Sequence, residues 1–256
     1  MPLRKPLRHI VLIAIAAATA CAAQAQVTLK PDGKWRYLLT AGANATSGNA
    51  DTTQFNATGE AAKVSDHDKL TFRAQGNYGK VNGVASTQRY LAGGQYNRDI
   101  SPRSFYFGSA DFLRDRPANI ANRYSLAGGV GRHMVRRDDL TFDISVGIGR
   151  TQDDYVAPTS VLGEIRNKYG RTELVLAEET SHLLTTNTKL RQKFTLYPNI
   201  TDTGAYRALL DAGISVAMTN TLSLTAGINY RYDSDPGIGL KRGDASFVTG
   251  VSLRFD

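Results

Sequence analysis

Apolar and polar residues alternate with a period of two along most of the chain. The alternation is clearest in the last third, where one set of alternate positions holds Leu222, Leu224, Ala226, Ile228, Tyr230 and Tyr232. The positions between them hold Ser223, Thr225, Gly227, Asn229 and Arg231. Neighbouring side chains of a β-strand point to opposite faces of the sheet, so this period predicts strands with one apolar and one polar face.

The same pattern recurs about twelve times, in runs of roughly 10–14 residues separated by turn residues. The runs begin near Trp35, Thr52, Lys69, Ser86, Ser104, Asn122, Leu140, Arg171, Thr188, Tyr206, Thr221 and Asp244. An even number of strands is typical of single-chain bacterial outer-membrane barrels. The pattern therefore predicts an all-β chain that folds as an antiparallel up-and-down barrel of about 12 strands.

The connections between the runs also alternate. Those expected to be tight are Ser65-Asp66-His67-Asp68, Ser101-Pro102-Arg103, Arg136-Arg137-Asp138-Asp139, Thr185-Thr186-Asn187 and Thr219-Asn220. Those expected to be longer include Asp115 to Ala121, Gln152 to Lys168, Pro198 to Gly204 and Ser234 to Gly243. Short turns at one end and long loops at the other are typical of outer-membrane barrels.

A secreted soluble β-sandwich would show the same period, because its apolar faces would bury each other. Strand length, the alternation of turns and loops, and aromatic residues near strand ends favour the membrane barrel, since aromatic girdles mark both membrane interfaces. The aromatic residues that we expect in these girdles are Trp35, Tyr37, Phe105, Tyr124, Phe142, Tyr206, Tyr230, Tyr232, Phe247 and Phe255.

The first residues have the order of a secretory signal peptide. Arg4, Lys5 and Arg8 precede an apolar run, and Ala23-Gln24-Ala25 follows it. Basic, apolar and small residues in this order predict cleavage after Ala25. A lipoprotein modified at Cys21 is the alternative, although a lipobox usually has leucine where this chain has Ala18. We therefore expect a signal peptide at 1–25, an N-terminal periplasmic segment at 26–34 and an outer-membrane barrel at 35–256.

Cleavage would change the composition in two ways. It would remove three basic residues, so the net charge would fall from +8 to +5, and it would remove the only cysteine. A mildly basic chain without a long basic block does not indicate a nucleic-acid partner. The mature chain would also contain no apolar stretch of about 18 residues that could form a membrane-spanning helix.

The last third of the chain resembles a known family. The segment Tyr230-Arg231-Tyr232-Asp233-Ser234-Asp235-Pro236 is followed by Lys241, Asp244 and the ending Val251-Ser252-Leu253-Arg254-Phe255. Earlier matches are Ser47-Gly48-Asn49-Ala50-Asp51-Thr52, Phe112-Leu113-Arg114-Asp115-Arg116, Arg191-Gln192-Lys193-Phe194 and Tyr197-Pro198. Together they resemble the family of bacterial proteins described as salt-induced outer-membrane proteins, domain of unknown function 481.

The resemblance implies an outer-membrane barrel of a Gram-negative bacterium with a link to salt or osmotic stress. None of its motifs is catalytic. The partners that follow are outer-membrane lipid, lipopolysaccharide and, during biogenesis, the barrel assembly machinery. Such barrels commonly end on an aromatic residue, whereas here Asp256 follows Phe255.

Candidate chemistry is sparse. The histidines His67, His133 and His182 lie near expected turns or strand ends, and no serine stands at a fixed spacing from them as a nucleophile would. Pairing of His182 with Glu178 or Glu179, metal binding by Asp66-His67-Asp68, and ion or lipopolysaccharide binding by Asp153, Asp154, Asp233 and Asp235 are weaker alternatives to ordinary turn chemistry. We expect no enzyme, no cofactor and no metal site.

The polar faces carry the remaining candidates. Charged residues expected to face the barrel interior are Arg73, Arg191, Arg207, Arg231, Arg254, Asp143, Asp211 and Glu173 or Glu178. Internal ion pairs that plug the barrel are one interpretation, and a narrow channel for small, anionic solutes is another. A membrane-embedded hydrolase is a third. The family-motif loop, Tyr232, Asp233, Ser234, Asp235 and Pro236, is a further candidate site.

Overall fold

The computed structural model describes residues 30–46 and 51–255. Twelve β-strands account for most of these residues. They are β1 (Trp35–Thr46), β2 (Thr52–Val64), β3 (Asp68–Val81), β4 (Val84–Ser101), β5 (Ser104–Asp115), β6 (Ile120–Arg136), β7 (Leu140–Val161), β8 (Glu164–Leu183), β9 (Thr188–Pro198), β10 (Tyr206–Ala217), β11 (Leu222–Asp233) and β12 (Gly243–Phe255). The expected signal peptide at 1–25 lies outside the described residues.

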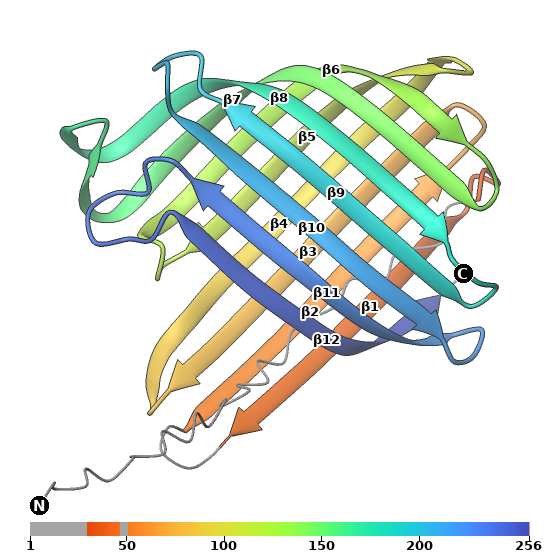
Figure 1. The fold of residues 1–256 in the computed structure, drawn as a ribbon, viewed down its shortest axis with the longest axis horizontal. Coiled ribbons are helices and arrows are strands. Elements are labelled where there is room, and N and C mark those ends of the chain that lie inside the picture. The colour runs from red at the N-terminus through yellow and green to blue at the C-terminus, as the bar shows by residue number, and fades with distance from the viewer. Residues whose placement is uncertain (1–29, 47–50, 256) are drawn as a thin grey trace, which may run out of the picture.

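Each strand pairs antiparallel with its neighbours in sequence, and β12 pairs with β1, so the sheet closes into a barrel (Figure 1). The prediction of a twelve-stranded up-and-down barrel is confirmed. The sheet closes into a ring because of the chemistry of the membrane interior. Lipid offers no hydrogen bonds to the backbone, so strands can cross it only when each strand is paired with its neighbours.

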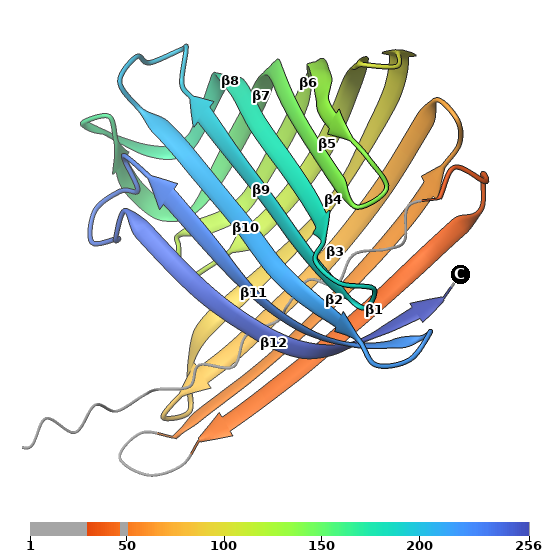
Figure 2. The ribbon, with the colours of Figure 1, turned by 45° about the vertical axis from the view of Figure 1, so that its right-hand side comes forward.

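The strands tilt strongly across the barrel (Figure 2). Counted along the chain, the second, fourth, sixth, eighth and tenth connections all lie at the end where β12 finishes. This end, with connections at 65–67, 102–103, 137–139, 184–187 and 218–221, is called the turn end. The opposite end, where β1 ends and β2 begins, has connections at 82–83, 116–119, 162–163, 199–205 and 234–242 and is called the loop end.

The prediction of a long loop from Gln152 to Lys168 is wrong. β7 and β8 continue through this segment and meet at a two-residue turn, Leu162-Gly163, where both residues have positive φ. The polar sequence of this segment resembles that of a loop. A hairpin that extends beyond the membrane-spanning wall does not contact lipid, so its strands need no apolar outer face. The asymmetry between the two ends therefore comes from extended strands as well as from loops.

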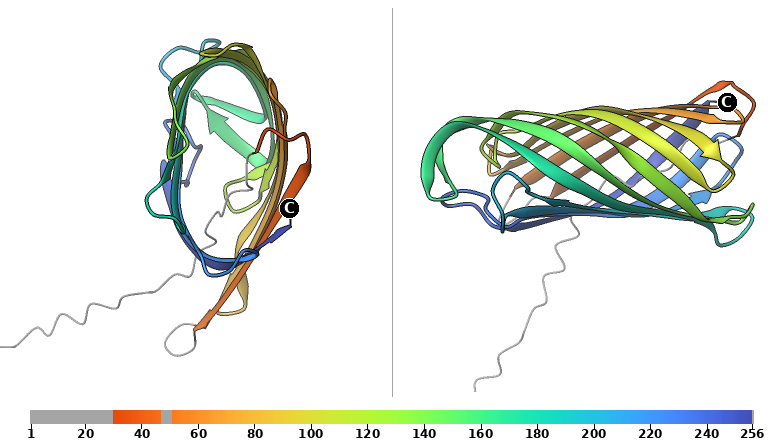
Figure 3. Two further views of the ribbon diagram at one scale, coloured as in Figure 1. Left: turned by 90° about the vertical axis from the view of Figure 1, so that its right-hand side faces the viewer. Right: turned by 90° about the horizontal axis from the view of Figure 1, so that it is seen from above.

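This β7–β8 hairpin bends over the loop end. Its register shifts between Asp154 and Thr159, so several residues of β7 have no partner on β8. Irregularities of this kind bend a strand pair. Seen along the barrel, the outline is oval and the hairpin crosses the opening (Figure 3).

The outer face is apolar and the inner face is mostly polar. Exposed side chains that alternate outward include Leu224, Ile228, Tyr230, Phe247 and Val251, whereas Ser223, Thr225 and Ser252 are buried. Most of the aromatic residues expected in girdles are exposed. Phe142 and Tyr232 are half-buried, and the expectation is wrong for Phe105, because its ring is 3 % exposed and lies inside the barrel beneath Gly131.

The residues before β1 are tied to the turn end. The Gly33 amide donates to the Val64 carbonyl, and the Arg36 guanidinium donates to both carboxylate oxygens of Asp32. This hydrogen bonding to its charged form holds the pKa of Asp32 well below its usual range.

A test of the inner packing uses two glycines. A Cβ at Gly129 would lie 2.2 Å from the Val146 carbonyl oxygen, whereas a Cβ at Gly108 would meet nothing within 4 Å. We expect Gly129→Ala to destabilise the barrel by about 1–3 kcal/mol, because backbone must move to admit the methyl group. Urea titrations of folded barrel, followed by heat-modifiable gel mobility, measure this. Equal stability of Gly129→Ala and the control Gly108→Ala would contradict it.

Candidate functional site

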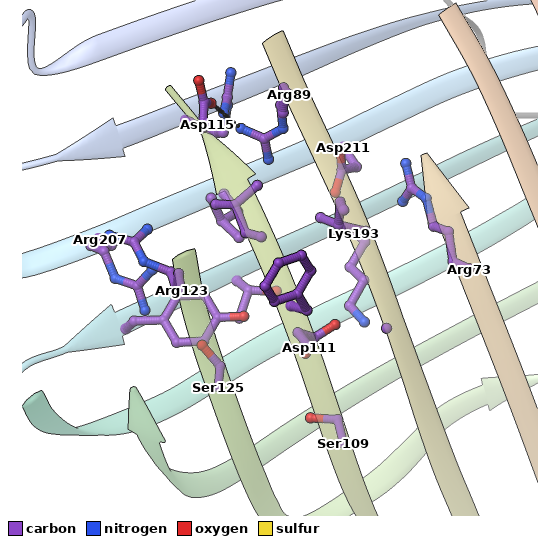
Figure 4. A pocket seen from close by; sticks show the side chains of 18 of the residues that line it. Arg73, Arg89, Ser109, Asp111, Asp115, Arg123, Ser125, Lys193, Arg207 and Asp211 are labelled. Atoms are coloured by element: carbon purple, nitrogen blue, oxygen red, sulfur yellow. Dashed lines mark hydrogen bonds and ion pairs between the residues drawn. The ribbon is translucent and has the colours of Figure 1, made fainter. Parts of the chain in front are cut away.

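The barrel encloses a cavity of about 810 Å³ whose lining comes from strands on all sides. The close view in Figure 4 shows charged side chains from opposing strands pointing into it, among them Arg73, Asp111, Lys193 and Asp211. Ten basic and ten acidic residues line the cavity. The lumen is therefore highly charged but nearly balanced.

A buried ion-pair network occupies the loop-end half of one wall. Arg123 makes two hydrogen bonds to Asp153, whose carboxylate also accepts from Arg171 at 2.9 Å. Glu173 accepts from Arg171 at 3.0 Å and from Arg207 at 2.7 and 3.0 Å. Asp153 and Glu173 are each 1 % exposed. Charges buried this deeply are stable only when they are paired and hydrogen-bonded, as these are.

A second cluster spans the lumen. Asp115 of β5 accepts from Arg89 of neighbouring β4 at 3.1 Å and from Arg231 of β11 at 2.9 Å. β5 and β11 lie six strands apart in the barrel, so this ion pair joins opposite walls. Arg231 also donates to Asp244 of β12 at 2.7 Å. The oval cross-section brings these side chains within reach, and the contact narrows the lumen there.

A third contact joins opposing walls at another level. The Lys193 ammonium of β9 lies 3.4 Å from the Gln95 side-chain oxygen of β4. Asp111 of β5 lines the cavity in the same region, close to Lys193 and Arg73. Polar contacts therefore cross the lumen at two levels, one near the loop end and one nearer the middle.

The structure places the charged residues expected in the interior as follows. Arg207 belongs to the buried network, and Arg231 to the cross-lumen cluster. Arg191 donates to Glu179 at 3.2 Å, and Asp211 lines the cavity beside Lys193. Asp143 accepts from His133, and Arg254 lies at the turn end opposite Leu38. These residues line the common cavity except Arg254, and the other expected charges, Arg73, Glu173 and Glu178, line it as well.

His133 has more partners than its place near a strand end indicated. Its Nδ1 lies 2.7 Å from Asp143 and its Nε2 lies 3.2 Å from Asp99, and its ring packs on Phe105. Asp99 is also paired with Arg136. A ring with a carboxylate at each nitrogen can donate twice only as the imidazolium. In the described part of the chain, no serine or threonine hydroxyl is hydrogen-bonded to a histidine ring.

One expectation about the loop acids is wrong, and another loop acid makes a contact beyond its own turn. Asp153 is not a loop residue, because it lies inside the barrel on β7 between two arginines. Asp235, expected to serve the local turn, reaches a distant element. Its carboxylate accepts the Leu162 amide at the tip of the β7–β8 hairpin, at 2.6 Å.

The family-motif loop thus holds the hairpin over the loop end. Besides the Asp235 contact, the Ile238 amide donates to Thr159 of the hairpin at 3.3 Å. Within the loop, Asp233 accepts the Asp235 amide and Ser234 accepts the Tyr206 amide. Tyr232 stacks on Tyr206, and Pro236 lines the cavity. We call the two contacts made by Asp235 and Ile238 the hairpin latch.

Several lumen residues escaped the sequence analysis, notably Arg89, Asp111, Asp115, Arg123, Arg171 and Lys193. Arg171 and Glu173 stand two apart, as do Thr151 and Asp153, which is the spacing of one strand face. That spacing would have placed them inward, but only if β7 and β8 had been extended through the polar segment.

Two features are absent from the described residues. Residues 30–46 and 51–255 contain no group of three or more histidine, cysteine, aspartate or glutamate side chains placed to hold a metal ion. The same residues contain no helix long and apolar enough to cross a membrane.

An apolar exterior, a charged interior and a closed even-numbered sheet define a transmembrane β-barrel of the outer-membrane type. The chain belongs to the family described as protein of unknown function, DUF481, whose model matches residues 39–255. The expected family is confirmed.

Known proteins similar to the chain include one sequence relative and several solved barrels. The chain is 24 % identical over 203 residues to the uncharacterized protein YdiY of Escherichia coli strain K12, and the match covers 77 % of this chain and 74 % of the relative. Its fold is similar to the translocator domain of autotransporter NalP from Neisseria meningitidis (16 % identity, 86 % and 88 % of the two chains, TM-score 0.47). It is also similar to the KdgM porin (8 % identity, 87 % and 100 %, TM-score 0.45).

A matched pair of substitutions tests the buried network. We expect Glu173→Gln to destabilise the barrel by about 3–5 kcal/mol, because two buried arginines lose their charge partner. Glu164→Gln removes the partner of Arg166 in an ion pair whose glutamate side chain is 71 % exposed, so its cost should stay below about 1 kcal/mol. Urea unfolding in detergent or vesicles measures both. Equal effects would show that the network is not a stabilising unit.

A protease experiment tests the hairpin latch. Asp235→Ala removes the acceptor of the Leu162 amide, so the hairpin tip should open more often and trypsin should cut after Arg166 and Lys168 faster than in the wild type. The control Asp66→Ala changes an aspartate in a turn-end connection and should leave this cleavage rate unchanged. Identical cleavage in all three proteins would show that the latch does not hold the tip.

Proposed function

We propose that the protein is a narrow outer-membrane channel for small polar solutes. The observation that carries this proposal is the charged 810 Å³ cavity crossed by the Asp115–Arg231 and Lys193–Gln95 contacts. Twelve strands stand between the filled eight-stranded barrels and the open sixteen-stranded porins, so a restricted passage fits this size. The loop end would face the outside and the turn end the periplasm, as in other barrels of this type.

The lining does not favour anions. Ten bases and ten acids line the cavity, so their formal charges cancel and little net field remains to select an ion by its sign. We therefore propose passage of small polar solutes with weak charge preference, in place of the anionic selectivity considered from the sequence. A role in salt or osmotic stress stays a prediction of the family resemblance, as do contacts with lipopolysaccharide and the barrel assembly machinery.

A closed, non-conducting barrel is the second candidate. It is favoured by the buried network on β6 to β10 and by the latched hairpin, which both reduce the open cross-section. Neither proposal includes catalysis. Among the described residues, the histidine with paired ring nitrogens, His133, faces two carboxylates rather than a nucleophile.

Planar-bilayer recording of refolded protein separates the two candidates. We expect current steps from the wild type and larger steps from a combined Asp115→Ala and Arg231→Ala variant, because the cross-lumen pair is removed. The control pair Arg137→Ala and Asp139→Ala removes an exposed turn-end ion pair and should leave the steps unchanged. In a potassium chloride gradient the wild-type reversal potential should lie near zero.

The outcomes are distinct. Absence of steps from both the wild type and the cross-lumen variant, with folding shown by heat-modifiable mobility, would favour the non-conducting barrel. A strongly displaced reversal potential would contradict the charge-balanced lumen while leaving conduction intact.

A further inference from the structure

The barrel wall is paired over only part of one seam. β1 and β12 match at five residue pairs, from Tyr37–Phe255 to Ala41–Val251, whereas β1 matches β2 along all twelve of its residues. Among the described residues, the β1–β12 register does not reach 43–46 of β1 or 243–248 of β12, although Gly42 still lies against the Thr249 carbonyl. Figures 1 and 2 both show the two strands together near the C-terminus and diverging toward the loop end. This unpaired stretch is called the upper seam.

The upper seam is an unusual feature for a membrane barrel. Each unpaired backbone group in contact with hydrocarbon costs several kcal/mol, so lipid cannot simply cover these strand edges. The edges border the polar lumen, and water from the lumen can satisfy them. The upper seam is therefore a place where the aqueous interior and the surrounding lipid come close together.

Aromatic side chains stand on both sides of the upper seam. Phe55 and Phe247 line the same cavity as the luminal charges, although they face outward and are 53 % and 47 % exposed. Phe55 lies on β2 opposite Ala43 of β1, and Phe247 lies on the unpaired part of β12. These two aromatic residues therefore flank the upper seam on its lipid side.

Apolar residues also continue inward from the seam. Val248, next to Phe247, points into the barrel and is 5 % exposed. Val248 thereby forms a small apolar inner patch of the cavity lining, directly behind Phe247. A flexible apolar chain that entered between Phe55 and Phe247 would exchange lipid for this lining at little cost in hydrophobic free energy.

We propose that the upper seam is a lateral opening through which the acyl chain of a bilayer phospholipid enters the lumen. The apolar flanks and the apolar inner patch receive the chain, and the polar head stays near the charged loop end of the lumen. This inference concerns access from the side of the barrel and does not depend on conduction along its axis.

Fluorescence quenching by brominated lipid tests the opening. Trp35 is the only tryptophan of the chain, so Trp35→Phe gives a dark background. In that background Val248→Trp reports from inside the barrel at the seam, and Val175→Trp is the matched control. Val175 is an inward valine with 6 % exposure on β8, which is paired with β7. Vesicles of phosphatidylcholine with dibrominated acyl chains should quench most of the fluorescence of Val248→Trp and little of that of Val175→Trp.

An engineered disulfide that closes the upper seam is compared with one placed where β1 and β12 are already matched. The upper pair, Ala43→Cys with Thr249→Cys, continues the β1–β12 register into the upper seam. The lower pair, Leu39→Cys with Leu253→Cys, joins two residues that are already matched. Cys21→Ser leaves no other thiol. Oxidation of the upper pair should abolish the quenching of Val248→Trp, whereas oxidation of the lower pair should leave it unchanged.

Three results would overturn the proposal. They are equal quenching of the two valine variants, no quenching of Val248→Trp, and quenching that survives the upper staple. The second of these is also the result expected if an extended strand of another protein occupied the seam. If Val248→Trp does not fold, Ser246→Trp on the same face of β12 replaces it.

Discussion

Backbone pairing in a solvent without hydrogen bonds is the constraint on which the whole structure depends. Lipid forces the sheet to close, and closure fixes an antiparallel order in which β12 returns to β1. Once the ring exists, every strand has a lipid side and a lumen side, and the two-residue period of the sequence follows. The place where this constraint is relaxed, the upper seam, is also where lumen and lipid meet.

Closure has a second consequence, for the side chains inside. Polar residues confined by a narrow ring must find partners within it, because a buried unpaired charge is costly. Along one wall, the paired residues are Arg123, Asp153, Arg171, Glu173 and Arg207. Across the lumen, Asp115 is paired with Arg231. The same pairs that stabilise the interior narrow it and balance its charge. Stability and restricted, weakly selective passage therefore have one physical origin.

The two ends of the barrel are built differently. At the turn end, short connections bring neighbouring strands together, and the residues before β1 are hydrogen-bonded to β2 and Arg36. At the loop end, β7 and β8 run past the wall and are held over the opening by Asp235 and Ile238. The motif by which the sequence resembles its family is thus a structural contact between two loop-end elements. Access to the lumen is restricted along the axis there, while the seam leaves a path from the side.

The sequence by itself determined the strand number, eleven strand starts to within a few residues, the apolar outer face and some of the charged positions that point inward. These depend on local alternation, which a single strand expresses. It did not determine the β7–β8 extension, because polar residues outside the membrane carry no lipid-facing signal. Nor did it determine which charges meet. Asp115 and Arg231 are 116 residues apart, and only the oval closure of the barrel brings β5 opposite β11. Pairing across the lumen and the unpaired upper seam are properties of the ring as a whole, so only the tertiary structure could decide them.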